Sequence, residues 1–147
     1  MGIIIIVFLF AVLTFSSYTD LKERKIPNTF IYISIGIIIL IRLFHHPQGI
    51  TSYIWGTVPA IITVIIYIFS NHSPIGGGDI KLLIFMGITL GGFNITLTII
   101  YSFVIILLYS VIVVFLNKKA ASLPLAPFLL LGTLLLFTQS YWFSFLV

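Results

Sequence analysis

The chain has 147 residues, of which 61% are hydrophobic and 7% are charged, and it carries a net charge of +4. Its mean hydropathy of +1.29 excludes a water-soluble domain with an ordinary polar surface. The absence of cysteine excludes disulfides and thiolate metal sites. The composition therefore predicts an all-α, polytopic membrane protein, and we expect residues 1–147 to form a single domain.

The first half of the chain contains three apolar segments. A helix needs roughly 20 apolar residues to cross the hydrocarbon core, so the length allows about six such helices. The first segment, residues 2–18, has neither a basic segment before it nor a small-residue cleavage site after it, so we expect a true span rather than a signal peptide. The second and third segments cover about residues 29–44 and 50–70, and Pro27 and Asn28 provide helix-start chemistry before the second.

The second half contains three more apolar segments. The fourth begins at Asp79 and ends near Gly91, so it has about 15 residues where a full crossing needs roughly 20. A short span among longer helices would place its acidic end in a cavity rather than in bulk water. The fifth follows directly, and the sixth, residues 123–147, carries Pro124 and Pro127 in its first turns.

The basic residues predict the orientation, because loops rich in Lys and Arg stay in the cytoplasm. Arg42 lies at an outer end, whereas the other basic residues lie in the first, third and fifth loops. We therefore expect a cytoplasmic (inner) membrane protein with both termini outside and with Asp20 and Asp79 on the cytoplasmic side. The basic residues of the three cytoplasmic loops are Lys22, Arg24, Lys25, Lys81, Lys118 and Lys119.

The stretch Gly76-Gly77-Gly78-Asp79 interrupts the apolar sequence. A carboxylate at the mouth of an apolar helix is costly to keep, which makes Asp79 a candidate functional residue. Glycines lack a Cβ atom, so they allow backbone conformations that other residues resist and let an extended peptide approach closely. We therefore predict that these glycines shape a substrate site beside Asp79, with Lys81 on the first turn of the same helix.

Asp20 is the second candidate. Glu23 lies among basic residues, where we expect it to be solvated, so Asp20 and Asp79 are the carboxylates left to act together. Two carboxylates held close cannot both ionise and therefore share a proton. One then acts as general base on a water while the other, protonated, polarises a peptide carbonyl. This pattern favours aspartic-protease chemistry, which needs neither a metal nor a cofactor.

Each feature by itself has a simpler interpretation. Asp79 could be an N-cap, Asp20 an interfacial residue of a basic loop, and the three glycines a flexible connector. We expect His45 and His46 to be solvated turn residues, and His72 is a candidate for a supporting role. The occurrence of both aspartates on one side of the membrane favours the functional interpretation.

Two motifs carry a resemblance to known proteases. Gly76-Gly77-Gly78-Asp79 resembles the G-x-G-D signature of intramembrane aspartyl proteases. Asp20, followed by Arg24 and Ile26-Pro27-Asn28, is similar to the first-aspartate motif of the prepilin (type IV leader) peptidases, and this resemblance covers nearly the whole chain. Presenilin and signal peptide peptidase share the G-x-G-D element, but they are much larger and have no Ile-Pro-Asn after the first aspartate.

The resemblance to the prepilin peptidases implies that Asp20 and Asp79 are the catalytic aspartates. It implies type IV pilin-like precursors as substrates, cut at the cytoplasmic face between a short basic leader and the hydrophobic helix of the mature protein. The segment with Pro124 and Pro127 is similar to a proline-bearing segment near the family's last helix. Substrate-binding or site-shaping roles then fall to Gly76, Gly77, Gly78, Lys81, Pro27, Asn28, Pro124 and Pro127.

The chain departs from the family pattern at one point. Many bacterial members carry a cytoplasmic insertion between the first spans, often with paired cysteines, which is associated with methylation of the new N-terminus by S-adenosylmethionine. This chain has no cysteine, and its first aspartate is Asp20. It therefore resembles the peptidase core without the methyltransferase insertion.

Two other classes of function remain open at this stage. A small proton-coupled transporter would use Asp79 as a protonatable site at a broken helix; it predicts acids near the bilayer midplane and an internal repeat, and neither is apparent. A non-catalytic membrane subunit of a secretion system would retain both aspartates without turnover. As partners we expect pilin-like precursors and membrane lipids but no nucleic acid, and the sequence does not indicate an oligomeric state.

Overall fold

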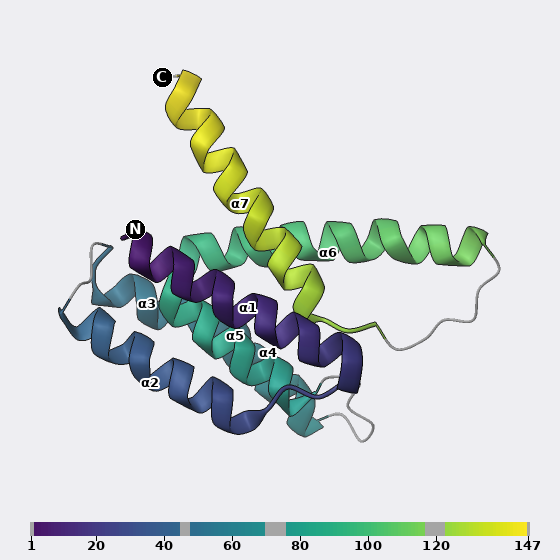
Figure 1. Cartoon of the computed structure of the whole chain (residues 1–147), viewed down its shortest axis with the longest axis horizontal. Coiled ribbons are helices and arrows are strands. Elements are labelled where there is room, and N and C mark those ends of the chain that lie inside the picture. The colour runs from purple at the N-terminus through teal and green to yellow at the C-terminus, as the bar shows by residue number, and fades with distance from the viewer. Residues whose placement is uncertain (1, 45–47, 70–75, 117–122, 147) are drawn as a thin grey trace.

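The computed structural model describes residues 2–44, 48–69, 76–116 and 123–146, and these residues form helices and connecting turns without any strand (Figure 1). Glycine and proline mark most of the boundaries, as expected for residues that leave or cannot continue a helix. The helices are α1 (Ile3–Glu23), α2 (Asn28–Phe44), α3 (Ile50–Gly56), α4 (Val58–Phe69), α5 (Gly77–Leu90), α6 (Gly92–Phe115) and α7 (Ala126–Leu146).

Helix α5 forms the centre of the molecule. It contacts α1, α2, α3, α4 and α6, and Figure 1 shows it running alongside α1 and α2, whereas α7 crosses α6 and extends away from them. Leu82, Phe85 and Met86 of α5 are fully buried, and Phe85 packs edge-on against Phe8 of α1 with 5.9 Å between ring centroids. With 14 residues, α5 is about 21 Å long, which is shorter than the hydrocarbon core of roughly 30 Å. The predicted shortness of this helix is therefore confirmed.

Close backbone contact between α3 and α5 allows this burial. A Cβ atom on Gly56 of α3 would collide with the carbonyl of Gly87 of α5, and one on Gly87 would collide with the carbonyl of Gly56. The expected third span is interrupted next to this contact, at Thr57, with Pro59 in the first turn of α4. Side chains larger than hydrogen at either glycine would push α3 away from α5.

Arg42 holds the C-terminal end of α5. It lies in the last turn of α2 and is buried. Its guanidinium donates to the carbonyl of Thr89 in α5 and stacks over the ring of Tyr53 in α3, 4.4 Å from the centroid. A cation at a helix C-terminus interacts favourably with the last carbonyls. Arg42, the basic residue that lies outside the first, third and fifth loops, is therefore part of a buried contact between α2, α3 and α5.

Within the described ranges, three helical segments are long and apolar enough to cross a membrane, namely α1, the combined segment Ile50–Phe69 and α6. Helix α2 and the Ala126–Gln139 part of α7 are shorter apolar helices. Large apolar side chains such as Ile65 of α4 and Leu107 of α6 are exposed, as expected for surfaces that face lipid. The chain is therefore an all-α membrane protein, as the composition predicts.

Two of the helix boundaries that differ from the prediction lie at the aspartates. Helix α1 does not end at Tyr18 but continues to Glu23, so Asp20 belongs to the helix and does not follow it. Helix α5 begins at Gly77, two residues before the expected start at Asp79. At both ends, polar residues or glycines continue the helix because tertiary contacts support it. Local helix propensity alone is a weak guide to such boundaries.

Candidate active site

Asp20 lies in the last turn of α1, and its side chain is only 8% exposed. The helix ends after it because Arg24 adopts the left-handed conformation (φ 51°, ψ 31°), and the Arg24 N–H donates to the Asp20 carbonyl. The Asp20 carboxylate oxygen Oδ2 accepts a hydrogen bond of 3.1 Å from the backbone N–H of Ala126, the first residue of α7. This bond joins the first and last helices of the chain.

Asp79 lies in the first turn of α5, with Gly76 as the N-cap residue. The interpretation of Asp79 as an N-cap is therefore wrong. Its own N–H donates to the Gly76 carbonyl at 3.0 Å, and its carboxylate accepts a hydrogen bond from the Gly76 backbone. This return of an acidic side chain to the N-cap backbone is half of a capping box. The carboxylate thus lies at the positive end of the helix dipole, where negative charge is favoured.

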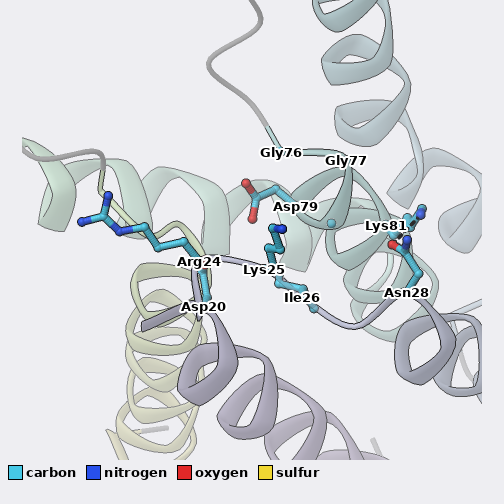
Figure 2. A pocket seen from close by; sticks show the side chains of 10 residues that line it. Asp20, Arg24, Lys25, Ile26, Asn28, Gly76, Gly77, Asp79 and Lys81 are labelled. Carbon is cyan, nitrogen blue, oxygen red and sulfur yellow. Dashed lines mark hydrogen bonds between the residues drawn. The ribbon is translucent and has the colours of Figure 1, made fainter. Parts of the chain in front are cut away.

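The two aspartates line one cavity of about 320 Å³ at one end of the bundle. Figure 2 shows the Asp79 carboxylate directed toward the end of α1 that carries Arg24 and Asp20. Both predicted catalytic residues are therefore brought to the same site from helices 59 positions apart in sequence. The lining residues are Asp20, Arg24, Lys25, Ile26, Asn28, Gly76, Gly77, Gly78, Asp79 and Lys81.

The electrostatics distinguish the two carboxylates. Asp79 lies at the polar end of α5, outside the three candidate spans. Burial raises the pKa of Asp79 to about 6, the negative charge of Asp20 adds to the rise, and the hydrogen bond from the Gly76 backbone opposes it. Desolvation disfavours a charged carboxylate, and a like charge nearby acts in the same direction. Asp79 is therefore a carboxyl group that can hold a proton near neutral pH.

The glycines act through close approach rather than through unusual backbone conformation. The glycines with positive φ in the described part of the chain are Gly49 and Gly91, so the expectation that Gly76, Gly77 and Gly78 need conformations forbidden to other residues is wrong. A Cβ on Gly78 would lie 3.1 Å from Cβ of Ile26, and one on Gly76 would lie 3.2 Å from Oδ2 of Asp79.

Gly77 differs from its two neighbours, since a Cβ there would meet nothing within 4 Å among the described residues. The three successive glycines are therefore not equivalent. The outer two allow Ile26 and the Asp79 carboxylate to lie against the backbone, whereas the middle one has room for a side chain.

Lys81 is directed away from the aspartates. Its Nζ donates to Oδ1 of Asn28, the first residue of α2, at 2.7 Å, and lies 4.7 Å from the centroid of the Tyr32 ring. Figure 2 shows Lys81 and Asn28 together at the side of the cavity opposite Arg24. Lys81 and Asn28, both predicted site residues, thus form one contact that ties α5 to α2 at the cavity rim.

The three predicted prolines lie next to the site but are not among the residues that line the cavity. The Pro27 carbonyl accepts from the N–H of Ile31 at 3.3 Å and so begins α2. Pro124 precedes α7 and Pro127 is in its first turn, so the expectation that both lie in helical turns is wrong for Pro124. His45, His46, His72, Lys118 and Lys119 lie outside the described residues.

Sequence reasoning missed two components of the site. The backbone N–H of Ala126 contacts Asp20, and the side chain of Ile26 packs against Gly78. No side chain marks the role of Ala126, because the group that contacts Asp20 is its backbone N–H; the neighbouring Pro127 marks only the start of the helix. Among the residues that line the cavity, Asp20 and Asp79 are the ones with carboxylates that could bind a metal ion. The described residues contain no group of three or more His, Cys, Asp or Glu that could hold one.

A bundle of apolar helices with two carboxylates around one polar cavity defines a helical membrane protein with a site suited to proton transfer. A family model described as the type IV leader peptidase family matches residues 7–111, which include both aspartates. The chain belongs to this family and is a leader peptidase-type protease. Comparisons with curated proteins and with solved structures gave no match.

Proposed function

We propose that the chain is an aspartic endopeptidase in which Asp20 and Asp79 are the catalytic residues. The observation that carries this proposal is that the only two aspartates of the chain, one from α1 and one from α5, line the same cavity. A pair of carboxylates in which one is protonated can activate a water and polarise a carbonyl without any other group.

The surroundings of the two carboxylates support different roles for them. The Oδ2 atom of Asp20 accepts a backbone N–H, and a hydrogen bond of this kind favours the ionised carboxylate. Asp79 has its pKa raised to about 6 by burial and by the charge of Asp20, which favours the protonated form. We therefore assign Asp20 as the general base and Asp79 as the general acid of the pair.

The reaction follows from these roles. Asp20 removes a proton from a water in the cavity, and the water oxygen forms a bond to the carbonyl carbon of the scissile peptide. Asp79 transfers its proton to the carbonyl oxygen, which gives a tetrahedral diol. The protonated Asp20 then donates its proton to the leaving nitrogen, the C–N bond breaks, and Asp79 recovers a proton from the diol as the carboxylic acid product forms.

The substrate class that we propose is type IV pilin-like precursors, cut at the cytoplasmic face of the inner membrane between a basic leader and an apolar helix. The cavity rim itself carries Arg24, Lys25 and Lys81, so it does not attract a basic leader. Basic loop residues of this kind fit anionic lipid headgroups, with roughly 1 kcal/mol for each residue near the surface. Their role is to anchor and orient the single domain in the membrane.

The test of the proposed function is cleavage by the purified protein in detergent of a panel of pilin-like precursors, read by mass spectrometry. We expect one cut before the apolar helix of at least one precursor, and no cut with Asp20→Asn or Asp79→Asn. Cleavage that survives in either variant would remove that residue from the mechanism. If the wild-type protein cleaves no precursor, the protein fits the non-catalytic subunit better.

The proposed orientation can be tested on the same protein because it has no cysteine. Glu23, at the cavity end of α1, and Gln48, beside Gly91 at the other end of α5, are both exposed. In cells that carry Glu23→Cys or Gln48→Cys, a membrane-impermeant maleimide is expected to label Cys only at position 48. Labelling only at position 23 would place the cavity on the outer face.

A further inference from the structure

The first turn of α7 presents one backbone donor to Asp20. The first four N–H groups of a helix have no partner within the helix in the ordinary pattern. In α7 the N–H of Phe128 and that of Leu129 both donate to the carbonyl of Leu125, each at 3.1 Å. Pro127 has no N–H. Ala126 is therefore the residue of this turn whose N–H remains to bond outside the helix, and it donates to Asp20.

We propose that the Ala126 N–H is a positioning donor that fixes the Asp20 carboxylate in its catalytic orientation, so that α7 completes the site without contributing a side chain to the chemistry. This proposal rests on the proposed function. Both partners are buried, with Asp20 8% exposed and Ala126 fully buried, so water does not compete freely for the bond. The bond uses Oδ2 of Asp20, and in this proposal the other carboxylate oxygen contacts the substrate water.

The segment before α7 explains why this donor is available. Pro124 and Pro127 flank Leu125 and Ala126, and proline fixes its own backbone and restricts the residue before it to extended conformations. The prolines thus present the Ala126 N–H in a defined direction and remove a competing donor at the next position. This gives Pro124 and Pro127 a site-shaping role although neither lines the cavity.

Several charged residues line the cavity or lie on the helix turn that holds Asp20. Arg24, Lys25, Asp79 and Lys81 line the same cavity, and Lys22 and Glu23 lie on the same helix turn. The first turn of α7 carries neither an acidic nor a basic side chain. The influence of α7 on Asp20 therefore comes from its backbone, and a test must change the backbone donor while leaving these charges in place.

The decisive experiment replaces the donor without changing the side-chain charges. Ala126→Pro removes the N–H at the first helical position, where proline is well tolerated, and lactic acid incorporated at position 126 replaces the N–H by an ester oxygen with almost no change in shape. Ala126→Gly retains the N–H and is the matched control. All three are compared with wild type in the cleavage assay, over a range of pH and substrate concentration.

We expect the proline and ester forms to lose about tenfold in kcat, the equivalent of one hydrogen bond to a charged group, with KM within about twofold. We also expect the acid limb of their pH–rate profile to move to higher pH, because the ionised member of the pair loses a donor. Ala126→Gly, which retains the N–H, should lose much less kcat than the proline and ester forms and should show no shift of the acid limb. Wild-type kcat and pH profile in the ester form, or an equal loss in the Gly form, would overturn the proposal. If the proline variant does not fold, the kinetics of the ester form alone test the proposal.

A second measurement does not depend on turnover. The chain has five alanines, so ¹⁵N-alanine labelling gives a spectrum in which Ala126 is assigned by its loss in Ala126→Gly. We expect Asp20→Ala to move the Ala126 amide proton upfield, because it removes the charged acceptor, and Asp79→Ala to have a much smaller effect. Equal effects of the two variants would overturn the contact. If the spectrum shows the contact between Asp20 and Ala126 but no precursor is cleaved, the contact is present and the proposed function is wrong.

Discussion

The two ends of α5 are built from similar residues but behave differently. At the N-terminal end, Gly78 lies against Ile26, and Asp79 faces a polar cavity. At the C-terminal end, Gly87 lies against the backbone of Gly56, and the buried Arg42 donates to the last turn. Both ends carry the charge that suits the helix dipole. The N-terminal end of α5 is the open end, because it borders the cavity, and the C-terminal end is the closed end, because neighbouring helices pack against it.

This difference separates stability from chemistry along a single helix. Arg42 has partners on α3 and α5, so its charge is used within the fold. Asp79 is partly buried beside Asp20, and its pKa is raised to about 6, so its charge state remains adjustable. Substitutions at the open end should therefore change activity more than stability, and substitutions at the closed end should do the reverse.

Asn in place of either aspartate would remove the proposed shared-proton pair while keeping the size of the side chain. Asp20→Asn and Asp79→Asn are each expected to reduce kcat/KM for a pilin-like precursor by at least about a hundredfold, the low end of what acid–base groups contribute. Thermal unfolding in detergent should change little for Asp79→Asn. Glu23→Gln is the control, since Glu23 is exposed, and its activity should stay within about twofold of wild type.

The protonation state of Asp79 should set the pH dependence of cleavage. If Asp79 must be protonated, activity is present below its pKa of about 6 and falls about tenfold for each pH unit above it. The alkaline limb of kcat/KM should therefore have its midpoint near this value. Because the chain has two aspartates, [4-¹³C]aspartate labelling reports both carboxyls directly. Asp20→Asn should lower the pKa of Asp79, since the charge of Asp20 raises it; an unchanged titration of Asp79 would show that the pair is not coupled.

At the closed end, Gly87→Ala should destabilise the fold. The added Cβ would collide with the Gly56 carbonyl, and overpacking of this kind costs about 1–3 kcal/mol. The measurement is the midpoint of thermal unfolding in detergent. Gly36→Ala in α2 is the matched control, because a Cβ there meets nothing within 4 Å among the described residues. Equal stability of the two variants would mean that α3 and α5 do not depend on this close approach.

At the open end, Gly78→Ala and Gly77→Ala form a matched pair. A Cβ on Gly78 would press on Ile26 at 3.1 Å, and one on Gly77 would enter open space. We expect Gly78→Ala to lower kcat by about tenfold, because a displacement of this order misplaces the neighbouring carboxylate, while Gly77→Ala remains near wild type. Identical kinetics of the two variants would reduce the glycine segment to a simple connector.

The smallest effect is expected at the cavity rim. Lys81 bonds to Asn28 at 2.7 Å, and this hydrogen bond is exposed to solvent, so the pair contributes about 1 kcal/mol or less to stability. Lys81→Gln and Asn28→Ala should therefore resemble each other, with activity within about threefold of wild type. A rise in KM with Lys81→Gln alone would instead show that Lys81 contacts the substrate. An upward shift of the acid limb would show that its charge acts on the aspartates.

The sequence was sufficient to predict the class of fold, because runs of apolar residues separated by glycine and proline specify membrane helices directly. It placed the end of α1 too early, at Tyr18. The polar run after Tyr18 resembles a loop, and only the contact of Asp20 with α7 shows why the helix continues. The break between α3 and α4 was also missed, although Pro59 in the following turn was a local signal for it.

For the site, the sequence identified the two carboxylates because acidic residues are costly in an apolar chain. The expectation that the glycines need unusual backbone conformations was wrong, since Gly78 has no positive φ and lies against Ile26. The role of Ala126 was not predictable in this way, because a backbone N–H has no signature in the side-chain sequence. Contacts between distant segments, such as Lys81 with Asn28, likewise require the fold.

The bond between Asp20 and Ala126 joins residues 106 positions apart, and this separation has a consequence for biogenesis. A ribosome makes the chain from its N-terminus at about 5–20 residues per second, so both aspartates are synthesised before α7. During that interval the buried carboxylate of Asp20 lacks its amide donor. Maturation of the site is thereby tied to completion of the polypeptide, and a nascent chain that still lacks α7 is expected to leave the membrane proteins around the translocon uncut.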